Sequence, residues 1–124
     1  MPIHKILIVE DEIIPAMALE SGLITAGFQT VLALSGDEAI LRIESDKPDL
    51  VVIDINLHAN VDGIETARWI KDRFGIPLIF ITGYSDTAIR RKADEVGYLG
   101  YLVKPIETES ILVIIDACHA KEGI

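Results

Sequence analysis

The 124-residue sequence is poor in cysteine, in basic residues and in long apolar runs. Its only cysteine, Cys118, excludes an internal disulfide and is typical of a reducing compartment. No apolar run approaches the roughly 20 residues that a membrane-spanning helix needs, and the N-terminal residues do not have the layout of a signal peptide. We therefore expect a cytoplasmic protein with no membrane partner.

Basic residues are outnumbered, since 11 lysines and arginines face 20 aspartates and glutamates, for a formal net charge of −9. An acidic surface repels nucleic-acid phosphates and anionic lipid headgroups, so we expect no direct nucleic-acid partner. Net acidity also favours solubility and does not by itself locate a site. A local cluster of acids would, in addition, attract a cation.

The sequence has no linker, low-complexity tract or internal repeat, and its length suits a single domain over residues 1–124. Short apolar runs alternate with longer segments, which predicts five strands and five helices in alternation. The predicted strands are Lys5–Val9, Gln29–Leu34, Asp49–Asp54, Leu78–Thr82 and Tyr101–Val103. The predicted helices are Ile13–Ala26, Gly36–Ser45 with Ser35 as N-cap, Gly63–Phe74, a helix that Ser85 caps and that ends near Val96, and Glu107–His119.

Strands that are separated by helices pair in parallel through right-handed crossovers. The first, third and fourth predicted strands are apolar on both faces, as a sheet covered on both sides requires. The second strand alternates more and is expected at an edge. We therefore predict an α/β fold, a doubly wound five-stranded parallel sheet with helices on both faces.

Polar side chains stand where four of these strands end: Glu10 and Asp11 after the first, Asp54 on the third, Thr82 on the fourth and Lys104 after the fifth. Open parallel sheets bind ligands at this edge. Carboxylates held together repel one another unless a cation or a proton intervenes, and Mg²⁺ prefers such oxygen ligands. The pattern therefore predicts a Mg²⁺ site.

A carboxylate beside a bound metal can also attack phosphorus and form an acyl phosphate. Phosphoryl transfer needs in-line positioning and charge neutralisation. Lys104 would supply a positive charge, and Thr82 would supply a hydroxyl donor. Gly83 has no side chain and would leave room for the phosphoryl group.

The motifs resemble those of the receiver domain of two-component response regulators. They are Val9-Glu10-Asp11-Glu12, Val51-Val52-Ile53-Asp54, Asp62-Gly63, Ile81-Thr82-Gly83 and Tyr101-Leu102-Val103-Lys104-Pro105. The resemblance covers essentially the whole chain and implies the flavodoxin-like strand order 2-1-3-4-5.

The resemblance also implies a role for each matching position. Asp54 would be the phosphoacceptor, and Lys104 would be followed by a cis peptide bond to Pro105. Glu10 and Asp11 would hold Mg²⁺, together with Asp54 and the backbone carbonyl of Asn56.

The resemblance also implies which residues change conformation on phosphorylation. Thr82 and Tyr101 would be the residues that move when Asp54 is phosphorylated. Asn56 and Tyr84 lie at positions that tune dephosphorylation in the family. The loop between Asp54 and the Asp62-Gly63 pair is one residue longer than usual, which we interpret as the mark of a subfamily.

The predicted last helix is apolar around a full turn, whereas a helix on one face of a sheet needs only one apolar stripe. Ile111 and Ile115 share such a stripe, so we expect Val113 and Ile114 to point elsewhere and to contribute to an exposed interface. In receivers, the face made by the fourth helix, fifth strand and fifth helix serves signalling and dimerisation. The resemblance thus implies a downstream protein partner or a homodimer there.

The resemblance further implies a phosphodonor, which is a histidine kinase or a histidine phosphotransfer protein. Ile13 and Ile14, beside the acidic pair, match the surface on which that donor docks. The function implied is a phosphorylation-dependent signalling switch rather than a conventional enzyme.

Three alternatives stay open from the residues alone. A small Mg²⁺-dependent phosphohydrolase with an aspartate nucleophile would need a second acid two residues after Asp54, where this chain has Asn56. A flavodoxin-like flavin module would need a phosphate-cradling loop in place of Glu10-Asp11-Glu12. We expect a stand-alone receiver, and the alternative is a receiver fragment of a larger hybrid kinase or regulator.

Overall fold

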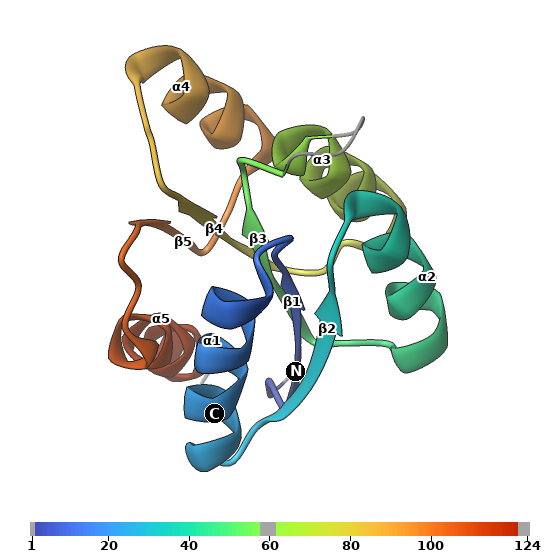
Figure 1. Cartoon of the computed structure of the whole chain (residues 1–124), viewed down its shortest axis with the longest axis vertical. Coiled ribbons are helices and arrows are strands. Elements are labelled where there is room, and N and C mark those ends of the chain that lie inside the picture. The colour runs from blue at the N-terminus through green and yellow to red at the C-terminus, as the bar shows by residue number, and fades with distance from the viewer. Residues whose placement is uncertain (1, 58–61, 122–124) are drawn as a thin grey trace.

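Five parallel strands form one sheet in the order β2-β1-β3-β4-β5 in the computed structural model, which describes residues 2–57 and 62–121 (Figure 1). The strands are β1 Lys5–Val9, β2 Gln29–Ala33, β3 Leu50–Asp54, β4 Leu78–Thr82 and β5 Gly100–Val103. The predicted doubly wound topology and strand order are confirmed. The first and last residue of each strand agree with the predicted ones to within a residue or two.

Five helices cover the sheet on both sides. They are α1 Ile13–Thr25, α2 Gly36–Asp46, α3 Gly63–Phe74, α4 Thr87–Val96 and α5 Thr108–Lys121. Figure 1 shows α1 and α5 together on one face and α2, α3 and α4 on the other. No helix of the described ranges is both long and apolar enough to cross a bilayer.

The core consists of two layers that the strands separate. Successive strand side chains point to opposite faces, so Leu7 and Val9 pack under α2 and α3, whereas Ile6 and Ile8 pack under α1 and α5. All residues of β3 and β4 are buried. Strand β2 is more exposed and lies at an edge, as its alternating sequence predicts.

One of the two predicted helix caps is wrong. Ser35 caps α2 by accepting a hydrogen bond from the Glu38 amide, as expected. Helix α4 begins one residue later than the position that Ser85 could cap, and Asp86 accepts from the Ile89 amide instead. A carboxylate is well suited to this place because it also interacts favourably with the helix dipole.

Glycine at position 63 brings the start of α3 against the end of β3. A Cβ atom there would lie 2.0 Å from the Asp54 carbonyl oxygen, so only glycine fits without displacing the strand end. Asp62 caps the same helix end by accepting from the Glu65 amide. Most of the loop that is predicted to be one residue longer than usual, residues 58–61, lies outside the described residues.

The segment after β5 carries a cis peptide bond between Lys104 and Pro105, as the resemblance implied. Helix α5 then packs closely on α1. A Cβ at Gly22 of α1 would lie 2.0 Å from the Thr108 hydroxyl oxygen, so the two helices meet at this glycine. Thr108 also lines the cavity beside Lys104, so this contact positions one side of that cavity.

Candidate functional site

The carboxyl ends of β1, β3 and β5 bring three charged side chains into contact. The Lys104 ammonium lies 2.9 Å from Glu10 Oε2 and 2.7 Å from Asp54 Oδ2. Both acids are almost inaccessible, at 1% and 2% exposure. Residues that are 50 and 94 positions away from Lys104 in sequence therefore form one buried cluster, which the sequence pattern predicted.

Two carboxylates share a single ammonium in this cluster, and the pKa values of Glu10 and Lys104 are both shifted. Burial raises the pKa of Glu10 to about 7, with hydrogen bonding to Asp54 adding to the shift. Burial alone would lower the pKa of Lys104, but its hydrogen bonds to Asp54 and Glu10 outweigh burial and raise that pKa. The cluster thus holds the ammonium firmly and still favours one further positive charge, whether a proton or a metal ion.

A group of acids suited to a metal lies at the end of β1. Carboxylate oxygens of Glu10, Asp11 and Glu12 lie within 4.8 Å of one another, and this is the one such group among residues 2–57 and 62–121. Hard oxygen ligands that are buried on one side and open to solvent on the other suit Mg²⁺, which keeps several of its waters. The residues present therefore fit the predicted ion.

The acidic group shares Glu10 and Asp11 with the predicted metal ligands and adds Glu12. Glu12, which sequence reasoning left out, is exposed, and its backbone amide donates to Glu10 Oε1 at 3.1 Å. Asp54 is not in this group, and in the ion-free structure its Oδ2 accepts from the Lys104 ammonium, as does Glu10 Oε2. The run of three consecutive acids was the signal that could have indicated Glu12.

Thr82 and Asn56 form the second half of the site. The Thr82 side chain is fully buried, and its hydroxyl donates to Asn56 Oδ1 at 2.6 Å, with the Tyr84 carbonyl as a second acceptor within reach. The Asn56 backbone amide donates to Asp54 Oδ1 at 2.8 Å. Next to Thr82, a Cβ at Gly83 would meet only the Lys104 side chain, at 3.9 Å, so this side of the site is open as predicted.

Tyr101 lies beside this region, on β5, and its ring also contacts the buried Phe80, at 6.5 Å between centroids. Its hydroxyl is 2.6 Å from the Ser85 hydroxyl, and the Arg90 guanidinium lies 4.3 Å from its ring centroid. Tyr98 packs at 5.7 Å between ring centroids. Tyr84, in contrast, is exposed.

The predicted interface residues are exposed with one exception. Ile14 is 78% exposed and Val113 64%, and Ile13 is exposed as well. Ile114 is half-buried instead, because it fills the space left by a glycine: a Cβ at Gly100 would lie 2.3 Å from its Cδ1 atom. The expectation of an exposed Ile114 is therefore wrong.

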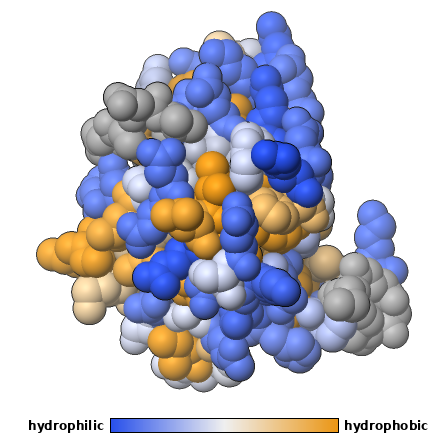
Figure 2. All heavy atoms as spheres, turned by 90° about the vertical axis from the view of Figure 1, so that its right-hand side faces the viewer, coloured by the Kyte–Doolittle hydropathy of each residue, from blue (hydrophilic) through white to orange (hydrophobic). Residues whose placement is uncertain are grey.

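The surface of α2 and α3 is more polar than that of α1, which lies on the other face of the sheet. Figure 2 shows the side on which α2 and α3 lie, where hydrophilic side chains cover most of the surface and apolar ones gather in a limited band. Large exposed apolar side chains of these two helices are Leu41 and Phe74. Helix α1 exposes four, namely Ile13, Ile14, Met17 and Ile24.

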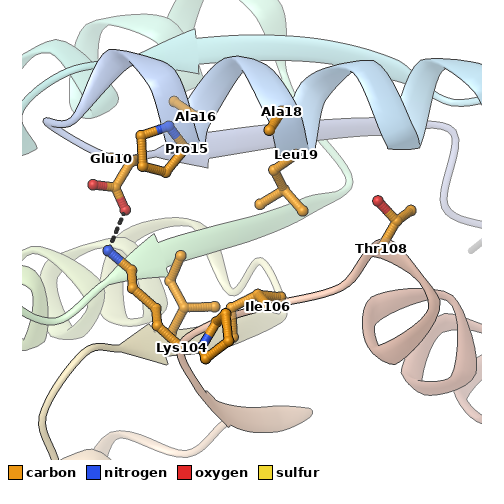
Figure 3. Close-up of a pocket in the computed structure, with 10 residues that line it drawn as sticks. Glu10, Pro15, Ala16, Ala18, Leu19, Lys104, Ile106 and Thr108 are labelled. Carbon is orange, nitrogen blue, oxygen red and sulfur yellow. Dashed lines mark hydrogen bonds and ion pairs between the residues drawn. The ribbon is translucent and has the colours of Figure 1, made fainter.

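A cavity of about 510 Å³, which the sequence did not indicate, opens between α1 and the segment after β5. Figure 3 shows Glu10 and Lys104 joined at one end of it, with Leu19 and Ile106 facing each other across the apolar part. The charged cluster is thus adjacent to an apolar recess on the α1 side.

Comparison with known proteins agrees with this geometry. The family model described as response regulator receiver domain matches residues 6–116. The transcriptional regulatory protein PdtaR of Mycobacterium tuberculosis is 33% identical over 91% of this chain and 55% of its own length. The probable transcriptional regulator ycf27 of Cyanophora paradoxa is 34% identical over 86% of this chain and 44% of its own. The chain thus spans about half the length of these curated relatives.

Solved structures show the same fold. The signal receiver domain of a modulated diguanylate cyclase from Desulfovibrio desulfuricans has a TM-score of 0.88 at 30% identity, over 98% of this chain and 97% of that one. A response regulator protein from Burkholderia pseudomallei, with a phosphorylated aspartic acid, a calcium ion and citrate, has a TM-score of 0.82 at 27% identity. That match covers 96% of this chain and 72% of the other.

Proposed function

The chain belongs to the response regulator receiver domains, and from that premise we propose that it is a Mg²⁺-dependent phosphoacceptor switch of two-component signalling. The observation that carries the proposal is the cluster of Asp54 and Glu10 around the Lys104 ammonium, with the acidic group of Glu10 and Asp11 beside it. A buried acid next to a cation site and a fixed ammonium is the equipment that phosphoryl transfer to a carboxylate requires.

In the proposed reaction, a carboxylate oxygen of Asp54 attacks the phosphorus of a phosphohistidine. An oxygen–phosphorus bond forms as the phosphorus–nitrogen bond breaks, and the imidazole leaves and takes up a proton. Lys104 donates to the phosphoryl oxygens and balances their charge, and Thr82 supplies a hydroxyl donor. Bound Mg²⁺, which Glu10 and Asp11 would hold with Asp54 and the Asn56 carbonyl, supplies further charge neutralisation.

The Burkholderia relative supports this assignment. Its structure contains a phosphorylated aspartic acid together with a divalent ion, calcium. The same two features are what we propose for Asp54 and its neighbouring acids. The reaction is self-assisted, and we propose that the protein acts as a signalling module rather than as an enzyme with an external substrate.

Phosphorylation would act by shifting a population of two states. Thr82 would turn toward the phosphoryl group, and Tyr101 would leave Ser85 and move inward. Strand β5 and helices α4 and α5 would then present a changed surface, on which Val103 and Val113 are exposed apolar residues. We propose this face as the site for a downstream protein or a second copy of the chain.

The phosphodonor is proposed to dock on the α1 side. Ile13, Ile14 and Met17 are exposed next to the acidic cluster, and the cavity beside Glu10 and Lys104 could receive an apolar side chain. A histidine kinase or histidine phosphotransfer protein with an apolar patch beside its phosphohistidine would fit. We propose that the protein acts in the cytoplasm, where such donors carry their phosphorylated histidines.

The direct test is phosphotransfer from a labelled phosphohistidine protein, with Mg²⁺ and with a chelator in its place. We expect label on Asp54 with Mg²⁺ and almost none without it. Label on another residue, or transfer that is indifferent to Mg²⁺, would reject the proposal. Sustained multiple turnover of p-nitrophenyl phosphate would instead favour the phosphohydrolase alternative.

A further inference from the structure

The side chain of Asn56 accepts hydrogen bonds from two donors beside the phosphoacceptor. One is the Thr82 hydroxyl, 2.6 Å from Asn56 Oδ1, and the other is the Gly83 backbone amide, 3.3 Å from the same oxygen. Two donors that converge on one oxygen form the same arrangement that would bind an oxygen of a phosphoryl group on Asp54. Asn56 is tied to Asp54 as well, through its backbone amide.

The identity of the accepting atom follows from the backbone. A carboxamide could in principle present either its oxygen or its nitrogen to Thr82, because a hydroxyl both donates and accepts. The Gly83 amide can only donate, so an NH₂ group facing it would leave two donors opposed. The oxygen must therefore be the atom that faces Gly83 and Thr82.

Burial differs sharply between the two partners. The Thr82 side chain is fully buried and needs an acceptor for its single proton. Asn56 is exposed, so its carboxamide can leave into water without burying or stranding a polar group. Thr82 therefore always needs an acceptor, whereas the exposed Asn56 carboxamide can be replaced as that acceptor.

We propose that the Asn56 carboxamide is an internal stand-in for a phosphoryl oxygen, which holds Thr82 and Gly83 in the unphosphorylated state until Asp54 is modified. This inference rests on the proposed function. It extends that function by naming the group that the phosphoryl oxygen must displace and therefore a residue that sets the balance between the two states.

The charges of the competing acceptors explain the direction of the exchange. A carboxamide oxygen is neutral, whereas a phosphoryl oxygen is charged and forms hydrogen bonds about twice as strong. Asn56 thus holds the donors only while no phosphoryl group is present. A Thr82 hydroxyl that turns to the phosphoryl group also releases the Tyr84 carbonyl, its second acceptor, and so frees the segment that leads into α4.

The test is Asn56→Ala, which removes the carboxamide and keeps the backbone carbonyl and amide. Beryllofluoride, a phosphoryl analogue, is titrated at saturating Mg²⁺ so that any change in metal affinity does not enter. Without the competing acceptor, we expect beryllofluoride to bind roughly 3- to 10-fold more tightly, the equivalent of one ordinary hydrogen bond. Unchanged or weaker binding would overturn the proposal.

Two further variants sharpen the result. Gln29→Ala removes an exposed carboxamide at the far end of the sheet and should leave beryllofluoride affinity unchanged. In a Thr82→Ala background, the gain from Asn56→Ala should shrink, because one of the two released donors is gone. A gain that is undiminished without Thr82 would show that the carboxamide acts in another way, against the proposal.

A measurement without any analogue separates this inference from the proposed function. In the free protein, Asn56→Ala should shift the Gly83 amide proton upfield, as the loss of a hydrogen bond does. Failure of the wild-type protein to bind beryllofluoride would reject the proposed function, whereas an unmoved Gly83 resonance would reject the stand-in alone.

Discussion

Acidic side chains stand at both ends of the sheet, but their partners differ. At the amino ends of the strands, Asp49 Oδ2 accepts from the backbone amides of His4 and Lys5, at 2.9 and 3.0 Å. At the carboxyl ends, Glu10 and Asp54 share the side-chain ammonium of Lys104. Fixed amides make the first acid part of the scaffold, whereas a side-chain partner leaves the second pair free to exchange ligands.

Other contacts at the amino ends serve the same structural purpose. The Ile3 amide donates to His119 Nε2 on α5, and the Lys5 ammonium donates to the carbonyl of Asp46, the last residue of α2. Each joins segments that are distant in sequence. The contacts at the amino ends of the strands therefore stabilise the fold. At the carboxyl ends, two carboxylates share one ammonium, and a bound cation would neutralise the remaining negative charge.

The largest expected effect is on labelling by a phosphodonor, which we compare between an Asp→Asn substitution at the carboxyl ends of the strands and one at their amino ends. Asp54→Asn should abolish labelling by a phosphodonor while the fold survives, because the single amide oxygen keeps one of the two hydrogen bonds that the carboxylate accepts from Lys104 and the Asn56 backbone amide. Asp49→Asn should be labelled as well as the wild type. Mass spectrometry of the intact proteins reports the label, and circular dichroism reports the fold. Labelled Asp54→Asn protein would refute the assignment of the acceptor.

Replacing the shared ammonium should have the next largest effect. Lys104→Met removes a donor to the transferring group, and the loss of one such donor typically slows a reaction by about 10²-fold. Mg²⁺ should bind more tightly at the same time, because the ammonium no longer competes for Glu10 and Asp54. Stopped-flow labelling and calorimetry with Mg²⁺ measure the two effects. Weaker Mg²⁺ binding by the variant would contradict the picture of competing cations.

The acidity of Glu10 predicts how Mg²⁺ binding depends on pH. Its pKa is raised from 4.5 to about 7 in the metal-free protein, so below pH 7 the ion must displace a proton. Mg²⁺ affinity should then rise up to roughly tenfold per pH unit toward pH 7 and level off above it. Glu10→Gln should flatten this profile, and a wild-type affinity that is constant between pH 5.5 and 8 would count against the assignment.

The raised pKa of Glu10 also predicts how the free energy of unfolding changes with pH. In the unfolded chain Glu10 loses its proton near pH 4.5, whereas in the folded, metal-free protein it keeps the proton until about pH 7. The folded state therefore binds more protons between these values, and the contribution of Glu10 to the free energy of unfolding falls as pH rises through this window. Saturating Mg²⁺ should reduce the loss, which urea titrations at several pH values would measure.

A smaller effect is expected at the amino edge. Asp49→Ala removes the acceptor of two backbone amides and should lower the free energy of unfolding by about 1 kcal/mol. Mg²⁺ affinity and labelling should not change, because the carboxyl edge is untouched. Urea unfolding beside a Mg²⁺ titration tests both halves. A loss of Mg²⁺ affinity in this variant would show that the two edges are coupled.

Sequence patterns predicted the sheet and the charged cluster because both depend on short-range features. Apolar runs define the strands, and a polar residue at the end of a run is carried to the carboxyl edge by parallel topology alone. Asp54, Glu10 and Lys104 could be placed together in this way without any knowledge of side-chain conformation.

Features that depend on packing could not be predicted. Ile114 is half-buried because Gly100 on a neighbouring strand leaves space for it, and no local pattern links the two residues. The partner of His119 lies at the other end of the chain. The N-cap of α4 is Asp86 and not the predicted Ser85. Both residue types can cap a helix, and the sequence did not indicate that the first turn begins at Thr87.

An NMR titration with beryllofluoride, with and without Mg²⁺, reports on the acidic site and on the residues around Thr82 in one experiment. From the assignment of Asp54 as a Mg²⁺-dependent phosphoacceptor we expect that the analogue binds only with Mg²⁺ and that the resonances of Thr82, Gly83 and Tyr101 shift together. Binding without Mg²⁺, or binding that leaves these three resonances in place, would contradict it.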